Sequence, residues 1–172
     1  GLQGMHIVSL LADHDSSVWA STDSGVYHSV RGVATRVTIP GFDLGKAPRL
    51  IHRDDRGRLL LGDPGLTIID GATVQRIGAA EGLTNGRVRS LYEDRENLWI
   101  GTADSGLFVM RHDKTVHLAP FNERLRRDVL GIIADDDGYL WLTSRTGLFR
   151  VARAALEAAA DGKATTVPVD RK

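Results

Sequence analysis

A tryptophan-centred motif recurs along this chain of 172 residues at a nearly constant spacing. The four anchor positions are 41, 39 and 42 residues apart, and three of them are tryptophan: Trp19, Leu60, Trp99 and Trp141. A small residue always follows two positions later: Ser21, Gly62, Gly101 or Thr143. A period near 40 residues indicates one supersecondary unit that is repeated, because such a unit buries its apolar surface only by stacking on its neighbours.

Each repeat contains the same order of strand and turn signals. An acidic turn precedes each anchor, at residues 13–16, 54–57, 94–97 and 135–138. A glycine followed by an aliphatic residue comes after each anchor, at Gly25, Gly65, Gly106 and Gly147. These signals leave room for a fourth strand at 34–39, 73–77, 115–118 and 165–169. Turn residues recur too often for helices of ordinary length, so the pattern predicts four short strands per repeat.

The sequence therefore predicts an all-β fold, a β-propeller segment of about four four-stranded antiparallel blades. We expect the blades at about 5–40, 48–78, 87–119 and 128–170. Neighbouring residues of a strand point to opposite faces, so Trp99 faces one way while Leu98 and Ile100 face the other. Both faces are apolar, and neighbouring blades are expected to cover both. We therefore interpret the tryptophans as core residues rather than sugar-stacking residues, and the small residues as space for the next blade.

One segment departs from the repeat. Residues 153–161 are rich in alanine, a strong helix former, and Gly162 is placed to end a helix. We expect a short helix inserted between the third and fourth strands of the last blade. The favoured interpretation is a solvated decoration, and the alternative is a docking surface for a neighbouring blade or domain.

The third repeat resembles a known family. Residues 82–94, then Asn97-Leu98-Trp99-Ile100-Gly101-Thr102 and Gly106-Leu107, are similar to the two-component-regulator propeller repeat. Glu96 occupies a slot that is usually glycine, and the second repeat has lost its tryptophan. The structural residues of the repeat are thus the four anchors with Gly25, Gly62, Gly101, Thr102, Gly106 and Gly147.

The resemblance implies a function and a location. Such repeats form the periplasmic sensor part of bacterial membrane receptors whose output part is a histidine kinase or a diguanylate cyclase. Their ligands are often oligosaccharides, and complete sensors have rings of about seven blades. The resemblance thus implies a non-catalytic, ligand-sensing or interaction module that is a fragment of a larger ring and contacts other blades or domains of its receptor.

Composition excludes several other classes. Lys plus Arg and Asp plus Glu both number 22, so no overall positive charge favours nucleic acid or an anionic membrane. There is no cysteine, and the six histidines lack metal-ligand spacing. Asp135-Asp136-Asp137-Gly138 lacks the alternating acidic pattern of a calcium loop. We predict no metal and no cofactor.

Catalysis finds little support in the residues. No Gly-x-Ser-x-Gly nucleophile motif is present, and the sequence nominates no pair of carboxylates for glycoside cleavage. The acidic turns are similar to the structural Asp-boxes of sialidase-type propellers. The alternatives left open are a propeller-fold polysaccharide lyase or glycoside hydrolase fragment and a protein-interaction scaffold. The basic run Arg124-Leu125-Arg126-Arg127 is interpreted as a solvated connection, with an anion-binding role as the alternative.

Overall fold

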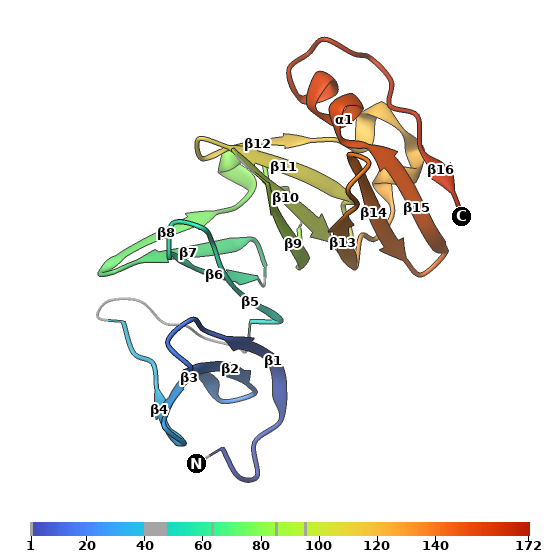
Figure 1. Ribbon diagram of the computed structural model, residues 1–172. Coiled ribbons are helices and arrows are strands. Elements are labelled where there is room, and N and C mark those ends of the chain that lie inside the picture. The colour runs from blue at the N-terminus through green and yellow to red at the C-terminus, as the bar shows by residue number, and fades with distance from the viewer. Residues whose placement is uncertain (1, 40–47, 63, 85, 95) are drawn as a thin grey trace. The chain divides into compact units, whose positions relative to one another are not determined.

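The computed structural model describes residues 2–39, 48–62, 64–84, 86–94 and 96–172. The chain divides into two compact units, Gly1–Arg76 and Ile77–Lys172. The described residues form four four-stranded antiparallel sheets whose strands neighbour each other in chain order (Figure 1). The predicted all-β fold of four-stranded blades is confirmed.

Unit 1 contains the first two blades. The first blade consists of β1 (Ile7–Ala12), β2 (Val18–Thr22), β3 (Gly25–Val30) and β4 (Val33–Arg36). The second consists of β5 (Leu50–Arg53), β6 (Leu59–Gly62), β7 (Leu66–Asp70) and β8 (Thr73–Ile77), the last of which ends at the boundary with unit 2.

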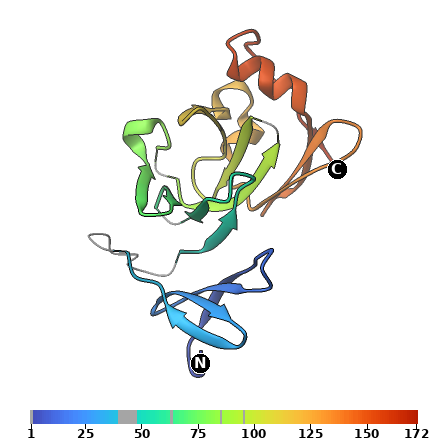
Figure 2. The ribbon, with the colours of Figure 1, turned by 60° about the vertical axis from the view of Figure 1, so that its left-hand side comes forward.

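Unit 2 contains the third and fourth blades. The third consists of β9 (Val88–Asp94), β10 (Asn97–Thr102), β11 (Leu107–Arg111) and β12 (Lys114–His117). The fourth consists of β13 (Gly131–Ala134), β14 (Tyr139–Ser144), β15 (Gly147–Ala152) and β16 (Asp170–Arg171). Short 3-10 helices η1 (Ala79–Glu81), η2 (Ala119–Phe121) and η3 (Glu123–Arg126) lie in the connections, and α1 (Arg153–Ala160) separates β15 from β16 (Figure 2).

The core of unit 2 explains why the tryptophan strand has apolar residues on both faces. In β10, Trp99 is opposite Tyr92 and Val109, and every residue of the strand is buried. Trp99 and Val109 share one cluster with Leu140 and Phe149 of the fourth blade. One blade thus supplies the apolar cover that the indole of the preceding blade needs.

Two of the four small residues after the anchors, Ser21 and Gly101, lie against the start of the next blade, whereas Thr143 of the last blade is exposed. A Cβ atom on Gly101 would lie 2.6 Å from the carbonyl oxygen of Val129, just before β13. Ser21 in unit 1 instead donates a 2.5 Å hydrogen bond from its hydroxyl to the carbonyl oxygen of Pro48, just before β5. Both positions are contact points between consecutive blades, and both are buried.

The predicted burial of the three tryptophans is only partly confirmed. Trp99 has no exposed surface, whereas Trp19 and Trp141 are half-buried. The indole N–H of Trp19 donates to Asp13 and that of Trp141 donates to Asp135, at 3.1 and 2.7 Å. In the third repeat Asp94 precedes Trp99 by five positions rather than six, and the buried indole N–H of Trp99 has no hydrogen-bond partner among the described residues.

Helix α1 confirms the predicted insertion but not the predicted solvated decoration. Gly162 has φ +71°, and the N–H groups of Gly162 and Lys163 donate to Ala159 and Ala158, which ends the helix in a Schellman motif. Leu156 of α1 is fully buried in the core of unit 2. An ion pair of 2.7 Å also joins Arg153 to Asp94, so the helix is fixed to the third blade.

The predicted fourth strand of the last blade, residues 165–169, is wrong. The strand that pairs with β15 is β16, opposite Phe149 and Arg150. The segment before it is bound elsewhere: the N–H of Val167 donates to Phe121, and the side chain of Asn122 donates to the carbonyl of Val167. Hydrogen bonds to the preceding connection therefore replace the expected ladder with β15.

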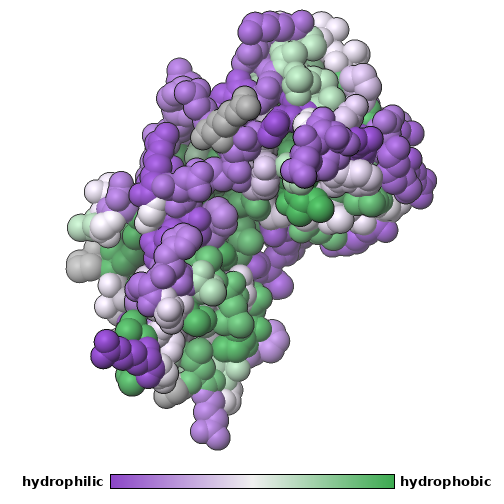
Figure 3. All heavy atoms as spheres, in the orientation of Figure 1, coloured by the Kyte–Doolittle hydropathy of each residue, from purple (hydrophilic) through white to green (hydrophobic). Residues whose placement is uncertain are grey.

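Apolar side chains remain exposed on the first blade. Ile7, Leu10 and Val18 of β1 and β2 are large and more than a third exposed. Figure 3 shows the corresponding apolar surface over β1 of unit 1. Their exposure marks a sheet face that the described part of unit 1 does not cover.

Candidate functional site

The residues predicted from the repeat have structural roles within their own blades. Gly25, Gly106 and Gly147 all have positive φ values and form the turns between second and third strands. Thr102 caps its turn: its hydroxyl donates to the carbonyl of Gly106 and accepts from the N–H of Ser105. Leu60, the substitute for tryptophan, is fully buried. These positions build the blade rather than a binding surface.

The acidic turns are likewise occupied by their own hydrogen bonds. One carboxylate oxygen of Asp135 accepts from the backbone N–H groups of Asp137 and Tyr139, and the other accepts from Trp141. The hydrogen bond from Tyr139, together with Trp141 and the nearby Arg150, lowers the pKa of Asp135. Asp54 accepts in the same way from Arg56 and Arg58. These carboxylates stabilise hairpins.

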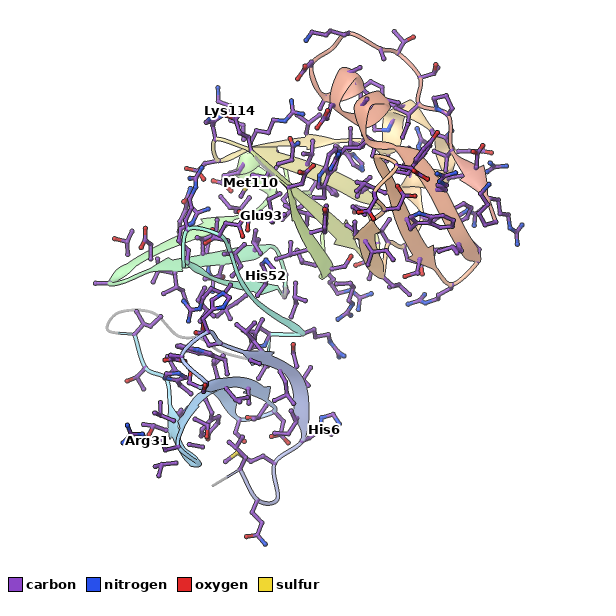
Figure 4. All side chains as sticks on the ribbon, viewed as in Figure 1. His6, Arg31, His52, Glu93, Met110 and Lys114 are labelled. Carbon is purple, nitrogen blue, oxygen red and sulfur yellow. The ribbon has the colours of Figure 1, made fainter. Side chains whose placement is uncertain are left out.

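The histidines are dispersed over the described chain. His6 points into solvent at the start of β1, and His52 lies on β5 (Figure 4). His28 stacks on Trp19, and His117 stacks on Phe108. No group of three His, Asp or Glu side chains close enough to hold a metal ion occurs among the described residues.

The other end of unit 2 carries a different kind of chemistry. We call this the connection end, and define it by the turns 103–106 and 145–146 and the connection 118–130. Antiparallel strands place these segments at one end of the two sheets, opposite the acidic turns. The N–H of Val129 in the connection donates to the carbonyl of Thr102, next to the first turn, and the N–H of Arg145 in the second turn donates to the carboxylate of Asp128.

Two ion pairs lie at the connection end. Arg87 binds Asp104 through two hydrogen bonds of 2.7 and 2.8 Å, and the Nε atom of Arg145 lies 3.7 Å from a carboxylate oxygen of Asp128. The hydrogen bond from Arg87 lowers the pKa of Asp104, and the positive charges of Arg87, Arg89 and Arg145 add to the effect. Asp104 is therefore surrounded by basic side chains, which favour its ionised form.

An open pocket of about 400 Å³ in this unit is lined by residues that include Arg127 and Thr146, the sequence neighbours of Asp128 and Arg145. Its walls are Glu123, Arg124, Arg127, Thr146, Phe149 and Arg171. Three strands or connections supply them: the connection with η3, the β14–β15 turn with the start of β15, and β16. Phe149 is the buried apolar wall, whereas the charged walls are exposed.

The two basic sides of the pocket are fixed by backbone carbonyls. Arg171 donates to the carbonyl of Thr146 at 3.0 Å, and Arg124 donates to that of Val169 at 2.5 Å. Leu125 of the same basic run is buried, so the run is a folded 3-10 turn and not simply a solvated connection. Arg171 could not be assigned from sequence, because its strand forms later than the predicted 165–169.

The acid–base pairs of a hydrolase do not appear in this pocket. One carboxylate, Glu123, lines it among the described residues. Glycoside hydrolysis uses a pair of carboxyl groups on either side of the scissile bond. The arrangement has hydrogen-bond donors, one acceptor and one aromatic wall, which suits binding.

Comparison with known proteins begins with the family model. Residues 82–104 match the model of the two component regulator propeller. No curated protein matches the chain significantly. Among the described residues, no helix has both the length and the apolar character that crossing a bilayer would require.

Solved structures share the fold at low sequence identity. The extracellular domain assigned to the hybrid two component system BT4673 from B. thetaiotaomicron is 17% identical with a TM-score of 0.71, over 90% of this chain and 21% of that one. PorZ, a surface component of the type-IX secretion system of Porphyromonas gingivalis, is 16% identical with a TM-score of 0.69, over 96% and 26%.

A third similar structure is an enzyme. The gluconolactonase XC5397 from Xanthomonas campestris is 13% identical with a TM-score of 0.60, over 96% of this chain and 61% of that one. The chain spans about a fifth of the BT4673 domain and about a quarter of PorZ. The third repeat thus matches the two component regulator propeller family, as its motif predicted, and the whole chain has the β-propeller fold of such extracellular domains.

Proposed function

We propose that this chain is part of the ligand-sensing or interaction propeller of a bacterial signal-transduction receptor, placed in the periplasm, and that it performs no chemistry on its ligand. The match of residues 82–104 to the two component regulator propeller carries the proposal. The fold similarity to an extracellular domain of a two component system is consistent with it.

The proposed sensing mechanism rests on the separation of the core of unit 2 from its connection end. Trp99 and Leu140 hold unit 2 together from inside, whereas the connection end holds exposed donors that are free to take a ligand. Ligand binding there would shift the connection between blades, and the shift would pass to an attached output domain. The proposed ligand is a small oligosaccharide or another periplasmic compound, and the proposed partners are other blades or domains of the receptor.

The experiment pairs binding with product analysis. The purified chain is incubated with a panel of neutral and acidic oligosaccharides, with calorimetry for binding and chromatography for products. We expect saturable binding of at least one compound and no new product.

Two outcomes would contradict the proposal. Time-dependent cleavage of a bound saccharide would favour the lyase or hydrolase alternative. If no small compound binds but a partner domain does, the interaction scaffold is favoured and small-molecule sensing is contradicted.

A further inference from the structure

The unpaired arginines of unit 2 are concentrated around the pocket at the connection end. Five arginines of the unit that lie outside the pocket pair with aspartates, whereas Arg126 has no carboxylate within ion-pair distance among the described residues: the five are Arg87, Arg111, Arg145, Arg150 and Arg153. For Arg124, Arg127 and Arg171, no carboxylate lies within ion-pair distance in the described part of the chain. These three are the arginines that line the pocket.

Two of these guanidinium groups are held in place before any ligand arrives. Arg171 lies opposite Phe149 in the β15–β16 pair and packs over Gly147, whose missing Cβ would be 3.4 Å from the Nε atom of Arg171. Its bond to Thr146 and the bond of Arg124 to Val169 each use one donor on a backbone carbonyl. Because guanidinium carries five N–H donors, most of them remain for a ligand.

The donor set selects a planar oxyanion. A guanidinium fork matches a carboxylate through two parallel hydrogen bonds, and both bonds are charge-assisted. Glu123 on the rim opposes a second negative charge and accepts hydrogen bonds from hydroxyl groups. Phe149 offers an apolar wall. A pocket near 400 Å³ is at the small end of ligand sites.

We infer that this pocket binds a small hydroxylated carboxylate, with Arg171 and Arg127 on the carboxylate, Glu123 on a hydroxyl group and Phe149 against the carbon skeleton. The inference rests on the proposed sensing function and names the class of ligand. It assigns to the basic run 124–127 the anion-binding role that sequence analysis left as the alternative.

The test uses two probes that differ in the carboxylate alone. Binding of glucuronate and of glucose to the 172-residue chain is measured by calorimetry, with inorganic phosphate as a compact anion. We expect glucuronate to bind and glucose to bind at least about tenfold more weakly. Added salt should lower the affinity for glucuronate. Phosphate should bind more weakly than glucuronate, because it cannot use Phe149.

Matched variants locate the site. Arg127→Gln removes a pocket guanidinium that makes no hydrogen bond within the described protein, and Arg126→Gln changes its neighbour outside the pocket. We expect Arg127→Gln to lower the affinity for glucuronate at least about tenfold and Arg126→Gln to leave this affinity unchanged. Both variants should keep the circular dichroism spectrum of the parent chain. Arg171→Lys should weaken it as well, since a lysine keeps the charge but loses the fork.

The outcomes separate this inference from the proposed function. The assignment is overturned if glucuronate does not bind, or if glucose or phosphate binds as tightly as glucuronate. It is also overturned if Arg126→Gln and Arg127→Gln change the affinity for glucuronate equally. If one of these outcomes occurs but neutral oligosaccharides bind with an affinity that Arg127→Gln does not change, the proposed sensing function is supported and the anion site is refuted.

Discussion

At the level of single residues, the acidic turns of three repeats share one hydrogen-bonding geometry, whereas the burial of the anchor residues varies. Asp13, Asp54 and Asp135 each begin a hairpin turn, and the residue three positions later has a positive φ: Ser16, Gly57 or Gly138. The second carboxylate oxygen then binds an indole in two blades and the guanidinium of Arg58 in the other. The carboxylate sets the turn, and the identity of its second partner is secondary.

The acidic turn predicts a pH dependence. Hydrogen bonding to Tyr139 and Trp141 lowers the pKa of Asp135 below the ordinary 3.8, so its stabilising effect is complete above that value and disappears as the pH falls through the lower folded pKa. Asp135→Asn should flatten the loss of stability between about pH 5 and pH 2. Urea unfolding across this range measures it, with Asp136→Asn, an exposed neighbour, as control. An unchanged slope in Asp135→Asn would contradict the assignment.

The buried indole predicts a large cavity effect. Trp99→Ala should lower the free energy of unfolding by about 3–5 kcal/mol, because the side chain is fully buried between two blades. Trp141→Ala should cost less, since Trp141 is half-buried and is covered by Arg150. Denaturant unfolding checks both, and a loss under about 1 kcal/mol for Trp99→Ala would contradict its core placement.

Among the elements, the glycine turns differ in what surrounds them. Gly106 and Gly138 have nearly the same φ, +83° and +84°. A Cβ atom at Gly106 would lie 1.8 Å from the carbonyl oxygen of Leu125, whereas nothing is within 4 Å at Gly138. The β10–β11 turn is therefore pressed against η3 of the connection, and the β13–β14 turn is open to solvent.

This pair of glycines predicts two different costs for one substitution. Gly138→Ala should destabilise by about 1–2 kcal/mol, the cost of a left-handed conformation in a residue with Cβ. Gly106→Ala should cost about 3 kcal/mol or more, because η3 must also move. Unfolding in urea measures both changes. Equal costs would show that η3 does not press on the turn.

At the scale of the whole molecule, equivalent strand positions are covered unequally. Leu10 has the same register position as Ile51 and Ile132, because each is opposite the residue after its anchor. Ile51 and Ile132 are buried against a preceding blade, whereas Leu10 is 62% exposed. Ile133 corresponds to Tyr92, which packs in the core, yet it is 66% exposed. The first and last blades thus keep apolar positions that blade stacking normally covers.

These exposed positions predict self-association of the isolated chain. Sedimentation velocity should show association that rises with concentration, because exposed apolar faces of sheets attract one another. Leu10→Lys combined with Ile133→Lys should favour the monomer. Val33→Lys is the control, since Val33 is 70% exposed but lies on the outermost strand of its blade. A parent chain that stays monomeric at high concentration would contradict the prediction.

The sequence by itself determined the number of blades and most of their strands, because strand pairing within a blade joins residues that are close in the chain. The fourth strand of the second blade, Thr73–Ile77, was predicted to the residue. The acidic and glycine turns could also be placed, since their hydrogen bonds span only a few residues.

Tertiary structure alone decided where the last strand forms, how α1 packs and which arginines share the pocket. The segment around Val167 binds the connection at Phe121 instead of β15, and this choice depends on a competition between partners far apart in sequence. That choice also moves the last strand to Arg171, beside Arg124 and Phe149. Local patterns specify a blade because its contacts are local, whereas a site between connections depends on how the blades stack.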